Sequence, residues 1–452
     1  MSVNEQDVLK ALRVVQDPDL HQDIVSLGFI KNMKIDGGKV AFDIEMTTPA
    51  CPVKDLFKSQ AAEAVKKLSG VTSVDVQMTS NVRQAPTGIK NLNMPTVKNL
   101  IAVASGKGGV GKSTVSANLA LALAKAGASV GLMDSDVYGP SIPRMLGVVG
   151  KQPDADPISK KMIPFEKHGI KFMSVGMLQQ ESDTALIWRG PMASKLVQQF
   201  LAGVEWGDLD YLLIDLPPGT GDIQLTLTQS VPLAGAVIVT TPQDVARTIT
   251  QKGLRMFQQV QVPIIGIVEN MSGFVCEHCH EVTPIFKKGG GRKMAEELHV
   301  PFLGEVPLEP IIAADGDYGV PTVAAHPDST SGKAYSLIAR QMASQLSIIN
   351  EATAKVSSRT REVSTEDPQV TIITWDDGTV MRYPNRYLRS MCPCAQCVNE
   401  VTGERMISLE AIDPAVRITA VSPVGRYALH FQWSDGHGTG LYSFDTLRKL
   451  GE

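Results

Sequence analysis

A glycine-rich stretch, 105–114, has the residue types and spacing of a phosphate-binding loop. The short apolar run 100–104 before it predicts a buried strand, and the apolar residues at four-residue spacing after it predict one face of a helix. Between a strand and a helix, successive backbone N–H groups can turn toward one anion. The glycines that allow this turn are Gly106, Gly108, Gly109 and Gly111.

Two polar side chains close this loop. Lys112 can reach the terminal phosphates of a bound nucleotide, and Ser113 can hold magnesium. A glycine turn that contains a lysine by chance is the alternative reading. The complete spacing between a predicted strand and a predicted helix argues against it.

Aspartates follow two further predicted strands. Asp134 and Asp136 come after the apolar run 129–133, and Asp215 comes after the run 211–214. Parallel strands bring such residues to the carboxyl edge of a sheet, where α/β folds bind ligands. Carboxylates there can organise the water shell of magnesium and orient an attacking water. A strand-end cap is the alternative for any one of them.

Cys276 and Cys279 are three positions apart, so both can bind one metal or cluster. They supply only half of a four-thiolate set. A two-fold dimer would supply the other half, and the two protomers would then share a [4Fe-4S] cluster. A zinc knuckle that uses His278 or His280, or a redox dithiol, remains open, because this spacing alone does not choose among them.

Three cysteines near the C-terminus, Cys392, Cys394 and Cys397, lie within six residues. With His437 they can complete a Cys3His zinc site within one protomer. Cys51 stands alone, just before a predicted helix that begins near Val53, where a helix N-terminus favours a thiolate. A partly buried structural cysteine is the alternative for Cys51.

The 452 residues predict more than one domain. We expect a small α/β domain at 1–82, a linker at 83–97, an α/β nucleotide-binding domain at 98–348, a flexible linker at 349–366 and a small β-rich domain at 367–452. The central domain should hold a mostly parallel sheet with helices on both faces. The strand 264–268 completes this sheet and is expected to end at Glu269, Asn270 and Met271.

Composition narrows the classes of partner. A net charge of −4 argues against nucleic-acid binding as the main task, and no run reaches the length of a membrane span. The first residues carry neither a basic nor an apolar leader, so a cytoplasmic location is expected. Clustered cysteines in a reducing compartment indicate metal rather than disulfides.

Lys107, second in the loop, makes the loop similar to the deviant phosphate loop of the MinD, ParA, ArsA and nitrogenase iron protein superfamily. The resemblance implies an ATPase in which Lys107 reaches across a homodimer to the partner's nucleotide. It also implies that Asp136 positions the attacking water, that Asp134 lies nearer the magnesium and that Asn270 contacts adenine. The implied ATP-binding residues are Gly106, Lys107, Gly108, Gly109, Val110, Gly111, Lys112, Ser113, Thr114 and Asn270.

Residues 98–340 resemble the Mrp/ApbC branch of iron–sulfur carrier ATPases, through the phosphate loop and the motifs 134–143, 215–222 and 270–279. The N-terminal domain resembles the SufT/PaaD-like family, and the C-terminal domain resembles the zinc-binding start of γ-butyrobetaine hydroxylase. This order of domains is similar to that of plastid scaffold proteins of the high-chlorophyll-fluorescence type.

The resemblance implies a homodimeric, ATP-dependent carrier that passes a labile [4Fe-4S] cluster to apoproteins. It implies that iron–sulfur assembly proteins are partners and that Cys51 is a candidate for transfer. The alternatives are a MinD/ParA-like positioning ATPase, which would need a membrane-binding tail or a basic DNA-binding face, and a zinc metallochaperone or regulator.

Overall fold

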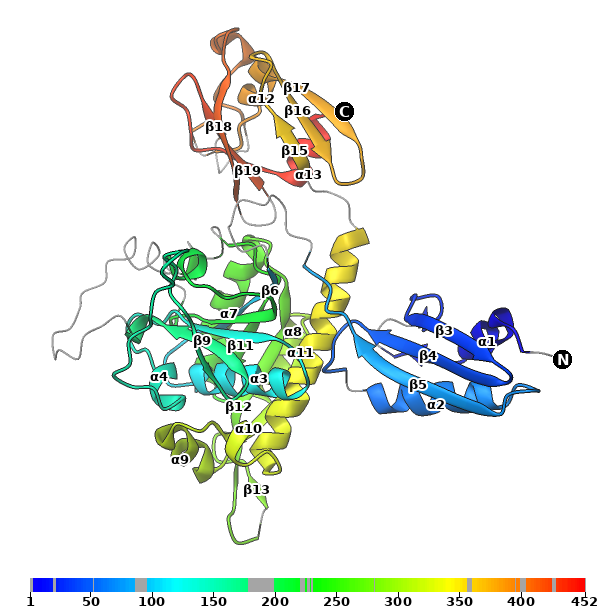
Figure 1. The fold of residues 1–452 in the computed structure, drawn as a ribbon. Coiled ribbons are helices and arrows are strands. Elements are labelled where there is room, and N and C mark those ends of the chain that lie inside the picture. The colour runs from blue at the N-terminus through cyan, green and yellow to red at the C-terminus, as the bar shows by residue number, and fades with distance from the viewer. Residues whose placement is uncertain are drawn as a thin grey trace.

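The computed structural model describes most of the chain as three bodies, with the N-terminal and C-terminal domains on different sides of a central domain (Figure 1). No helix in these described parts is both long and apolar enough to cross a bilayer. The described residues are 3–18, 22–51, 53–85, 96–177, 199–219, 224–225, 228, 231–279, 281–355, 360–394, 396–398, 404–424 and 428–451.

The N-terminal domain is a three-stranded sheet covered by helices. β4 pairs antiparallel with β3 and parallel with β5, and α2 makes the crossover between β4 and β5. Every second residue of β4 is buried. Its elements are α1 (Glu5–Leu12), β1 (Gln16–Asp17), β2 (Gln22–Asp23), β3 (Ile30–Asp36), β4 (Lys39–Met46), α2 (Lys54–Lys66) and β5 (Ser73–Ser80).

The central domain is built on a sheet that is nine-stranded over the described residues, in the order β13-β12-β11-β6-β10-β7-β9-β8, with β14 beside β12. Only β8 and β13 run antiparallel to their neighbours, so the predicted mostly parallel sheet is confirmed. The strands are β6 (Val97–Ser105), β7 (Val130–Asp134), β8 (Phe165–Lys167), β9 (Ile170–Ser174), β10 (Leu209–Asp215), β11 (Gly235–Thr240), β12 (Ile264–Val275), β13 (Val282–Thr283) and β14 (Phe302–Leu308).

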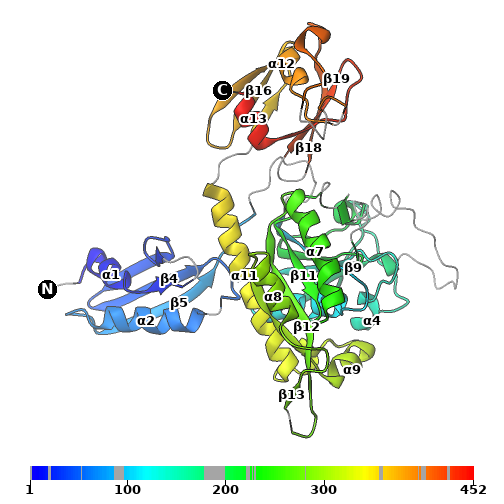
Figure 2. The same cartoon turned by 180° about the vertical axis from the view of Figure 1, so that it is seen from behind.

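Helices cover both faces of this sheet. α3 and α11 contact each other on one face, and α7 and α8 contact each other on the opposite face (Figures 1 and 2). The helices are α3 (Lys112–Lys125), α4 (Ile142–Met145), α7 (Asp244–Gln259), α8 (Gly290–Glu297), α9 (Pro310–Tyr318), α10 (Thr322–Ala325) and α11 (Thr330–Lys355).

Two expectations about this domain are wrong. β12 does not end at residues 269–271 but continues to Val275, because it pairs with β14 and with β13 beyond that point. The range 349–366 is not a flexible linker throughout. α11 continues to Lys355, and Asn350 is buried with its Nδ2 atom 2.9 Å from Oδ1 of Asn99. Strand β15 begins at Thr360.

The C-terminal domain holds two three-stranded sheets around an aromatic core. β16 and β17 pair antiparallel as a hairpin, across a turn in which Gly378 has a φ of 83°. Cys392 and Cys397 are buried in the same core. The elements are β15 (Thr360–Ser364), β16 (Val370–Trp375), β17 (Val380–Pro384), α12 (Asn385–Ser390), β18 (Ile418–Val424), β19 (Ala428–Trp433), β20 (Leu441–Ser443) and α13 (Phe444–Leu450).

Candidate functional site

The phosphate loop joins the end of β6 to the start of α3, as the sequence predicts. Gly111 has a φ of 77°, and a Cβ atom there would lie 2.3 Å from Nδ2 of Asn270. A Cβ atom at Gly106 would lie 2.6 Å from the backbone nitrogen of Thr250. Glycine at these two positions therefore lets the loop pass against β12 and α7.

Asp215, at the end of β10, is the centre of the polar contacts below the loop. Its carboxylate lies 2.7 Å from Nζ of Lys112 and accepts a hydrogen bond of 2.5 Å from the hydroxyl of Ser113. Ser116 donates a third contact of 2.6 Å, and Asp215 is fully buried. Ser116 is not among the residues predicted from the sequence, although its place one helical turn after Lys112 puts both residues on the same face of α3.

Asp134 lies beside Asp215, because β7 and β10 are paired in register. Its carboxylate accepts hydrogen bonds from the hydroxyl of Ser174 (2.9 Å) and from the backbone N–H groups of Asp136 (3.1 Å) and Ile142 (3.2 Å). Complete burial, together with the charge of Asp215, raises the pKa of Asp134 to about 7. Asp134 therefore ties the loop after β7 to the sheet.

Asp136 lies on the other side of the loop lysine. One carboxylate oxygen is 3.9 Å from Nζ of Lys112, and the other accepts hydrogen bonds from the backbone N–H groups of Tyr138 and Gly139. Lys112 is thus placed between Asp136 and Asp215. The structure brings together the predicted lysine, serine and three aspartates at one edge of the sheet.

Lys107 and Asn270 contact the loop from other elements. Nζ of Lys107, which is half-buried, lies 3.3 Å from Oε1 of Gln243, just before α7. Asn270 is buried, and its Nδ2 atom donates a hydrogen bond of 2.9 Å to the carbonyl oxygen of Val110. Asn270 therefore joins β12 directly to the phosphate loop.

Cys276 and Cys279 lie at the tip of a hairpin formed by β12 and β13, which projects from the central domain (Figure 1). The backbone N–H of Cys276 donates to the carbonyl of Glu281 (3.0 Å). Hydrogen bonds from the backbone N–H groups of Cys279 and His278 lower the pKa of the Cys276 thiol. Cys279 is exposed and Cys276 is half-buried. Because the tip is exposed, a metal or cluster bound by these two thiols can take its remaining ligands from another chain.

The described residues contain one group of three or more potential metal ligands that lie close together, and it is not at this hairpin. His280, a ligand in one of the alternatives, lies outside the described residues. Within them, Cys276 and Cys279 gain no third histidine, cysteine or carboxylate partner from their own chain.

That one group is Cys392, Cys394, Cys397 and His437, whose ligand atoms lie within 4.8 Å of one another. Nε2 of His437 is 3.2, 3.5 and 3.7 Å from the three sulfurs. In a tetrahedral zinc site the S–N edge is about 3.6 Å, given usual bond lengths of about 2.3 and 2.05 Å. The four predicted residues therefore fit a zinc ion.

The surroundings of this group suit a metal. Burial, and then the charge of Arg389, lower the pKa of His437, so its imidazole stays neutral and able to coordinate. Burial raises the pKa of Cys392 to about 12. Burial acts in the same direction on Cys394, but hydrogen bonds from Thr439 and Cys392 outweigh it and lower the pKa to about 7.

Arg389, which is 5% exposed on α12, is not among the residues predicted from the sequence. Its Nη1 atom lies 3.5 Å from the sulfur of Cys397, and its Nε donates to Asp435 (2.9 Å). Asp435 in turn accepts from the backbone N–H of His437 (3.0 Å). The sequence gives no signal that Arg389 contacts the metal-binding group, because its partners are 8 and 46 positions away in the chain.

Cys51 is half-buried and lies just before α2, near the predicted helix start. The loop that precedes it is docked on the central domain. Thr48 and Tyr211 are both buried, and the Tyr211 hydroxyl donates to Oγ1 of Thr48 (3.0 Å). Pro49 lies against Gly127, beyond the C-terminal end of α3. Since the phosphate loop is at the other end of this 14-residue helix, about 20 Å separates the two regions.

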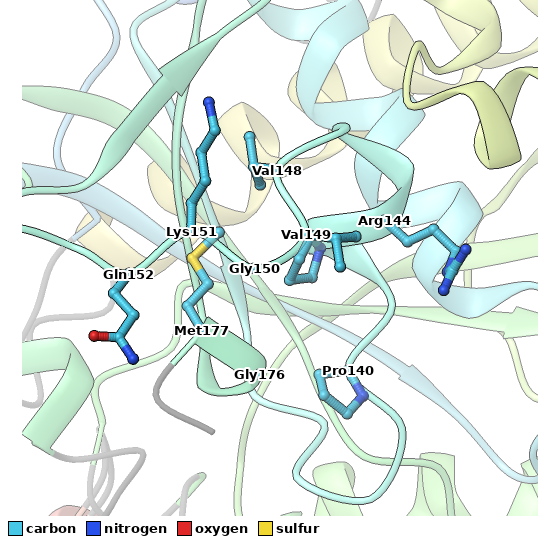
Figure 3. A pocket seen from close by; sticks show the side chains of 10 residues that line it. Pro140, Arg144, Val148, Val149, Gly150, Lys151, Gln152, Gly176 and Met177 are labelled. Atoms are coloured by element: carbon cyan, nitrogen blue, oxygen red, sulfur yellow. The ribbon is translucent and has the colours of Figure 1, made fainter. Parts of the chain in front are cut away.

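A cavity of about 380 Å³ opens beside the loop that carries Asp136. Pro140, Val149 and Met177 are among the residues that line it (Figure 3). Figure 3 shows the side chains of Arg144 and Lys151 pointing away from each other, so the two cations do not converge on one anion.

Three family models match successive parts of the chain. Residues 96–343 match "NUBPL iron-transfer P-loop NTPase". Residues 5–76 match "Iron-sulfur cluster assembly protein", and residues 362–448 match "Gamma-butyrobetaine hydroxylase-like, N-terminal".

Curated relatives cover most of the chain. The iron-sulfur cluster carrier protein of Synechocystis is 49% identical over 344 residues, which are 75% of this chain and 97% of that protein. The chloroplastic Fe-S cluster assembly factor HCF101 of Arabidopsis thaliana is 40% identical over 454 residues, which are 99% of this chain and 83% of that protein. Among solved structures, a nucleotide-binding protein from Archaeoglobus fulgidus in complex with ADP is 39% identical, with a TM-score of 0.45 and coverage of 50% of this chain and 88% of that one.

Proposed function

The chain belongs to the family of iron-transfer P-loop NTPases, and from that premise we propose that it is an ATP-dependent carrier that binds a [4Fe-4S] cluster and transfers it to apoproteins. Members of P-loop families bind and hydrolyse nucleoside triphosphates, and the loop, lysine and aspartates described above supply the parts that this reaction needs. The carrier role itself rests on the hairpin cysteines and on their connection to the loop.

One connection carries the proposal. Asn270 is hydrogen-bonded to the carbonyl of Val110, and the same strand continues to Val275, directly before Cys276. Between them Met271 has a φ of 58°, and the pairing of β12 with β14 is irregular from Asn270 to Phe274. A change in the loop on nucleotide binding can therefore reach the thiols through one short segment. Nucleotide binding changes the affinity for the cluster if the segment has one conformation with nucleotide and another without it, and if the two conformations place the thiols differently.

The cluster would lie between two copies of the chain. Each protomer offers two thiolates at the hairpin, whereas a four-iron cluster usually takes four. A two-fold axis that passes near the hairpin tips would bring the second pair into place. Such a site is labile, because separation of the protomers removes half of its ligands at once. A labile site suits a protein that gives its cluster away.

Each residue at the loop has a proposed role in nucleotide hydrolysis. Lys112 and the loop N–H groups hold the β- and γ-phosphates, while Ser113 and Asp215 hold magnesium, directly or through its waters. The hydrogen bonds from Ser113 and Lys112 to Asp215 fix that carboxylate where the metal would bind.

The remaining polar residues complete the proposed ATPase site. Asp136 orients the attacking water, Asp134 positions the loop that carries it, and Lys107 acts on the nucleotide of the partner protomer. Asn270 places the adenine while it holds the loop.

The C-terminal Cys3His set would hold one structural zinc ion, which closes a four-ligand site and leaves no open position for chemistry. Cys51 remains a candidate for cluster transfer. Its loop lies at the end of α3 that is distant from the phosphate loop.

The test is anaerobic reconstitution with iron and sulfide of the wild type and of the double variant Cys276→Ser/Cys279→Ser. We expect about one four-iron cluster per wild-type dimer and none in the variant, with zinc content and melting temperature unchanged. Cys51→Ser is the matched control, which should load as the wild type does. A double variant that still loads and delivers a full cluster would show that the carrier site lies elsewhere.

A further inference from the structure

A cavity of about 370 Å³ opens directly beside Cys276. Val275 at the end of β12 and Cys276 after it form one wall, and Pro310 and Ile311 at the start of α9 form the next. Residues 328–330, at the start of α11, close the cavity. Figures 1 and 2 show the hairpin and α9 together at one end of the molecule. A group seated in this cavity, which we call the Cys276 pocket, would lie next to one of the proposed cluster ligands.

The charged groups of the Cys276 pocket all have the same sign. Glu277, Glu309 and Asp328 line it, and no lysine, arginine or histidine among the described residues does. Glu309 accepts a hydrogen bond from the backbone N–H of Ser331 (2.8 Å), so the N-terminus of α11 compensates part of its charge. Glu277 and Asp328 are exposed at the rim. Their field therefore attracts a cation to the opening.

The cation is not a metal ion bound by these carboxylates. Within the described residues, the only group of histidine, cysteine and carboxylate atoms close enough for a metal is the Cys3His set in the C-terminal domain. The carboxylates of the Cys276 pocket stand apart around an apolar wall of Val275, Pro310 and Ile311. Separate carboxylates beside apolar side chains suit lysine or arginine side chains, which have an apolar stem and a charged end.

We propose that the Cys276 pocket is the docking site for the recipient polypeptide, and that it binds a segment in which lysine or arginine lies next to the cysteines that take the cluster. This inference rests on the proposed carrier function and names the surface on which transfer occurs. A basic residue in the pocket holds the recipient's thiols beside Cys276. Thiolates presented there can replace the carrier's thiolates one at a time, with the oxidation state of the cluster unchanged.

The first test measures binding without any cluster. The probe is a fluorescent 12-residue peptide with four lysines or arginines around a Ser-x-x-Ser pair, which stands in for the cysteines and cannot oxidise. We expect the cluster-free protein to bind it more tightly than the same peptide with glutamate at the four basic positions. Binding should weaken as salt rises from 50 to 300 mM, because salt screens the rim charges.

The variants are chosen to spare the cluster ligands and the cap of α11. Asp328→Lys should weaken binding of the basic peptide about fivefold or more, since a rim ion pair is replaced by a repulsion. Ile311→Trp should block the cavity without a change of charge. Asp317→Lys is the matched control, because it makes the same charge change at an exposed position of α9 outside the pocket. It should leave binding within about twofold of the wild type.

The second test measures transfer. Carriers loaded with cluster should hold equal amounts of iron in the wild type and in Asp328→Lys, but transfer to a cysteine-containing version of the basic peptide should be slower in the variant. Equal peptide binding by Asp328→Lys, Ile311→Trp and the wild type would overturn the docking site. Dissociation of the dimer by Ile311→Trp would overturn it too, because the occupant would then be a second copy of the chain. If the carrier function itself is wrong, the wild-type protein will not bind a cluster at Cys276 and Cys279. That result differs from a carrier that loads normally but does not bind the peptide.

Discussion

The side-chain amide of Asn270 donates a hydrogen bond of 2.9 Å to the carbonyl oxygen of Val110, so the strand that leads to the hairpin cysteines is fastened to the phosphate loop. The contact is buried, and Gly111 leaves the space that it needs. A nucleotide that moves the loop carbonyl must therefore move Asn270 or break this bond. This contact can couple the phosphate loop to Cys276, which comes six residues after Asn270 and directly follows the end of β12.

Asn270→Ala is predicted to uncouple the hairpin from the nucleotide. In the wild type, the alkylation rate of Cys276 and Cys279 by iodoacetamide should differ between the nucleotide-free protein and the protein with a non-hydrolysable ATP analogue and magnesium. In Asn270→Ala the two rates should be equal at saturating nucleotide. Asn32→Ala, at an exposed amide in the N-terminal domain, is the control. A nucleotide effect of full size in Asn270→Ala would rule out this contact as the link.

Substitution of the two lysines of the loop is predicted to have different effects on stability. Lys112→Ala should lower ATP hydrolysis by about a hundredfold or more, and it should also destabilise the fold because it leaves Asp215 as a buried charge without its cation. Lys107→Ala should lower hydrolysis but keep the melting temperature, because its contact to Gln243 is a single hydrogen bond of 3.3 Å. Phosphate release at several protein concentrations is the measurement, with the exposed Lys151→Ala as control. An unchanged rate in Lys107→Ala would remove its role across the dimer.

Local patterns explain which features the sequence could predict. The phosphate loop and the two cysteine sets are each encoded within about ten residues, apart from the distant His437. Chemistry restricts the residues at such sites to a few types, so their spacing is informative even without a structure.

Features that depend on distant packing could not be predicted in the same way. The end of α11 looks like a linker by its polar composition, yet Asn350 is buried against Asn99, and Glu351 pairs with Arg83 at 3.0 Å. The length of β12 depends on β13 and β14, which follow it in the chain. Because the strands that pair with this part of β12 come later in the chain, the residues of β12 alone do not show that the strand continues.

The pKa of Asp134 predicts an unusual pH dependence of stability. Burial and the charge of Asp215 raise it from 3.8 to about 7, so the folded protein holds a proton that the unfolded chain has released between those pH values. The contribution of this group to stability is thus lost as pH rises from about 4 to about 7. Asp134→Asn should therefore raise the melting temperature of magnesium-free protein at pH 8, by about 2–4 °C for each kcal/mol removed.

The gain in Asp134→Asn should vanish near pH 4, where the wild-type carboxyl is protonated in both states. Asp156→Asn is a control of opposite sign, since backbone N–H groups of Ser159 and Ile158 lower the pKa of that exposed carboxyl. It should give no gain at pH 8. Equal melting temperatures of Asp134→Asn and the wild type across this range would contradict the raised pKa.

Zinc binding by the C-terminal domain is predicted to release protons. At pH 7 the Cys392 thiol, with a pKa of about 12, is protonated, and the Cys394 thiol, with a pKa of about 7, is about half protonated. Zinc binds thiolates, so these two residues alone should release about 1.5 protons per zinc. The measurement is a titration of full-length Cys276→Ser/Cys279→Ser protein in weak buffer with a pH dye. Zinc uptake without acidification would contradict coordination by these thiols.

Arg389 is predicted to strengthen zinc binding through its charge. Three thiolates and one neutral histidine around Zn²⁺ leave a net charge of −1 in a buried place, and the guanidinium of Arg389 is 3.5 Å from the sulfur of Cys397. Arg389 also holds Asp435, which binds the backbone N–H of the ligand His437. Arg389→Gln removes the charge but keeps a hydrogen-bond donor, so zinc affinity in a chelator competition should fall about tenfold or more.

Arg386→Gln separates this effect from a general weakening of α12. Arg386 lies one turn earlier on the helix, and its Nε donates to the backbone carbonyl of Ile412 (2.9 Å) rather than to the metal-binding group. It should keep the wild-type zinc affinity even if the domain melts at a lower temperature. Arg389→Lys should recover part of the affinity, because the positive charge returns without the fork of donors. If Arg389→Gln and Arg386→Gln lost zinc equally, with equal losses of melting temperature, the arginine would act on the fold and not on the charge of the site.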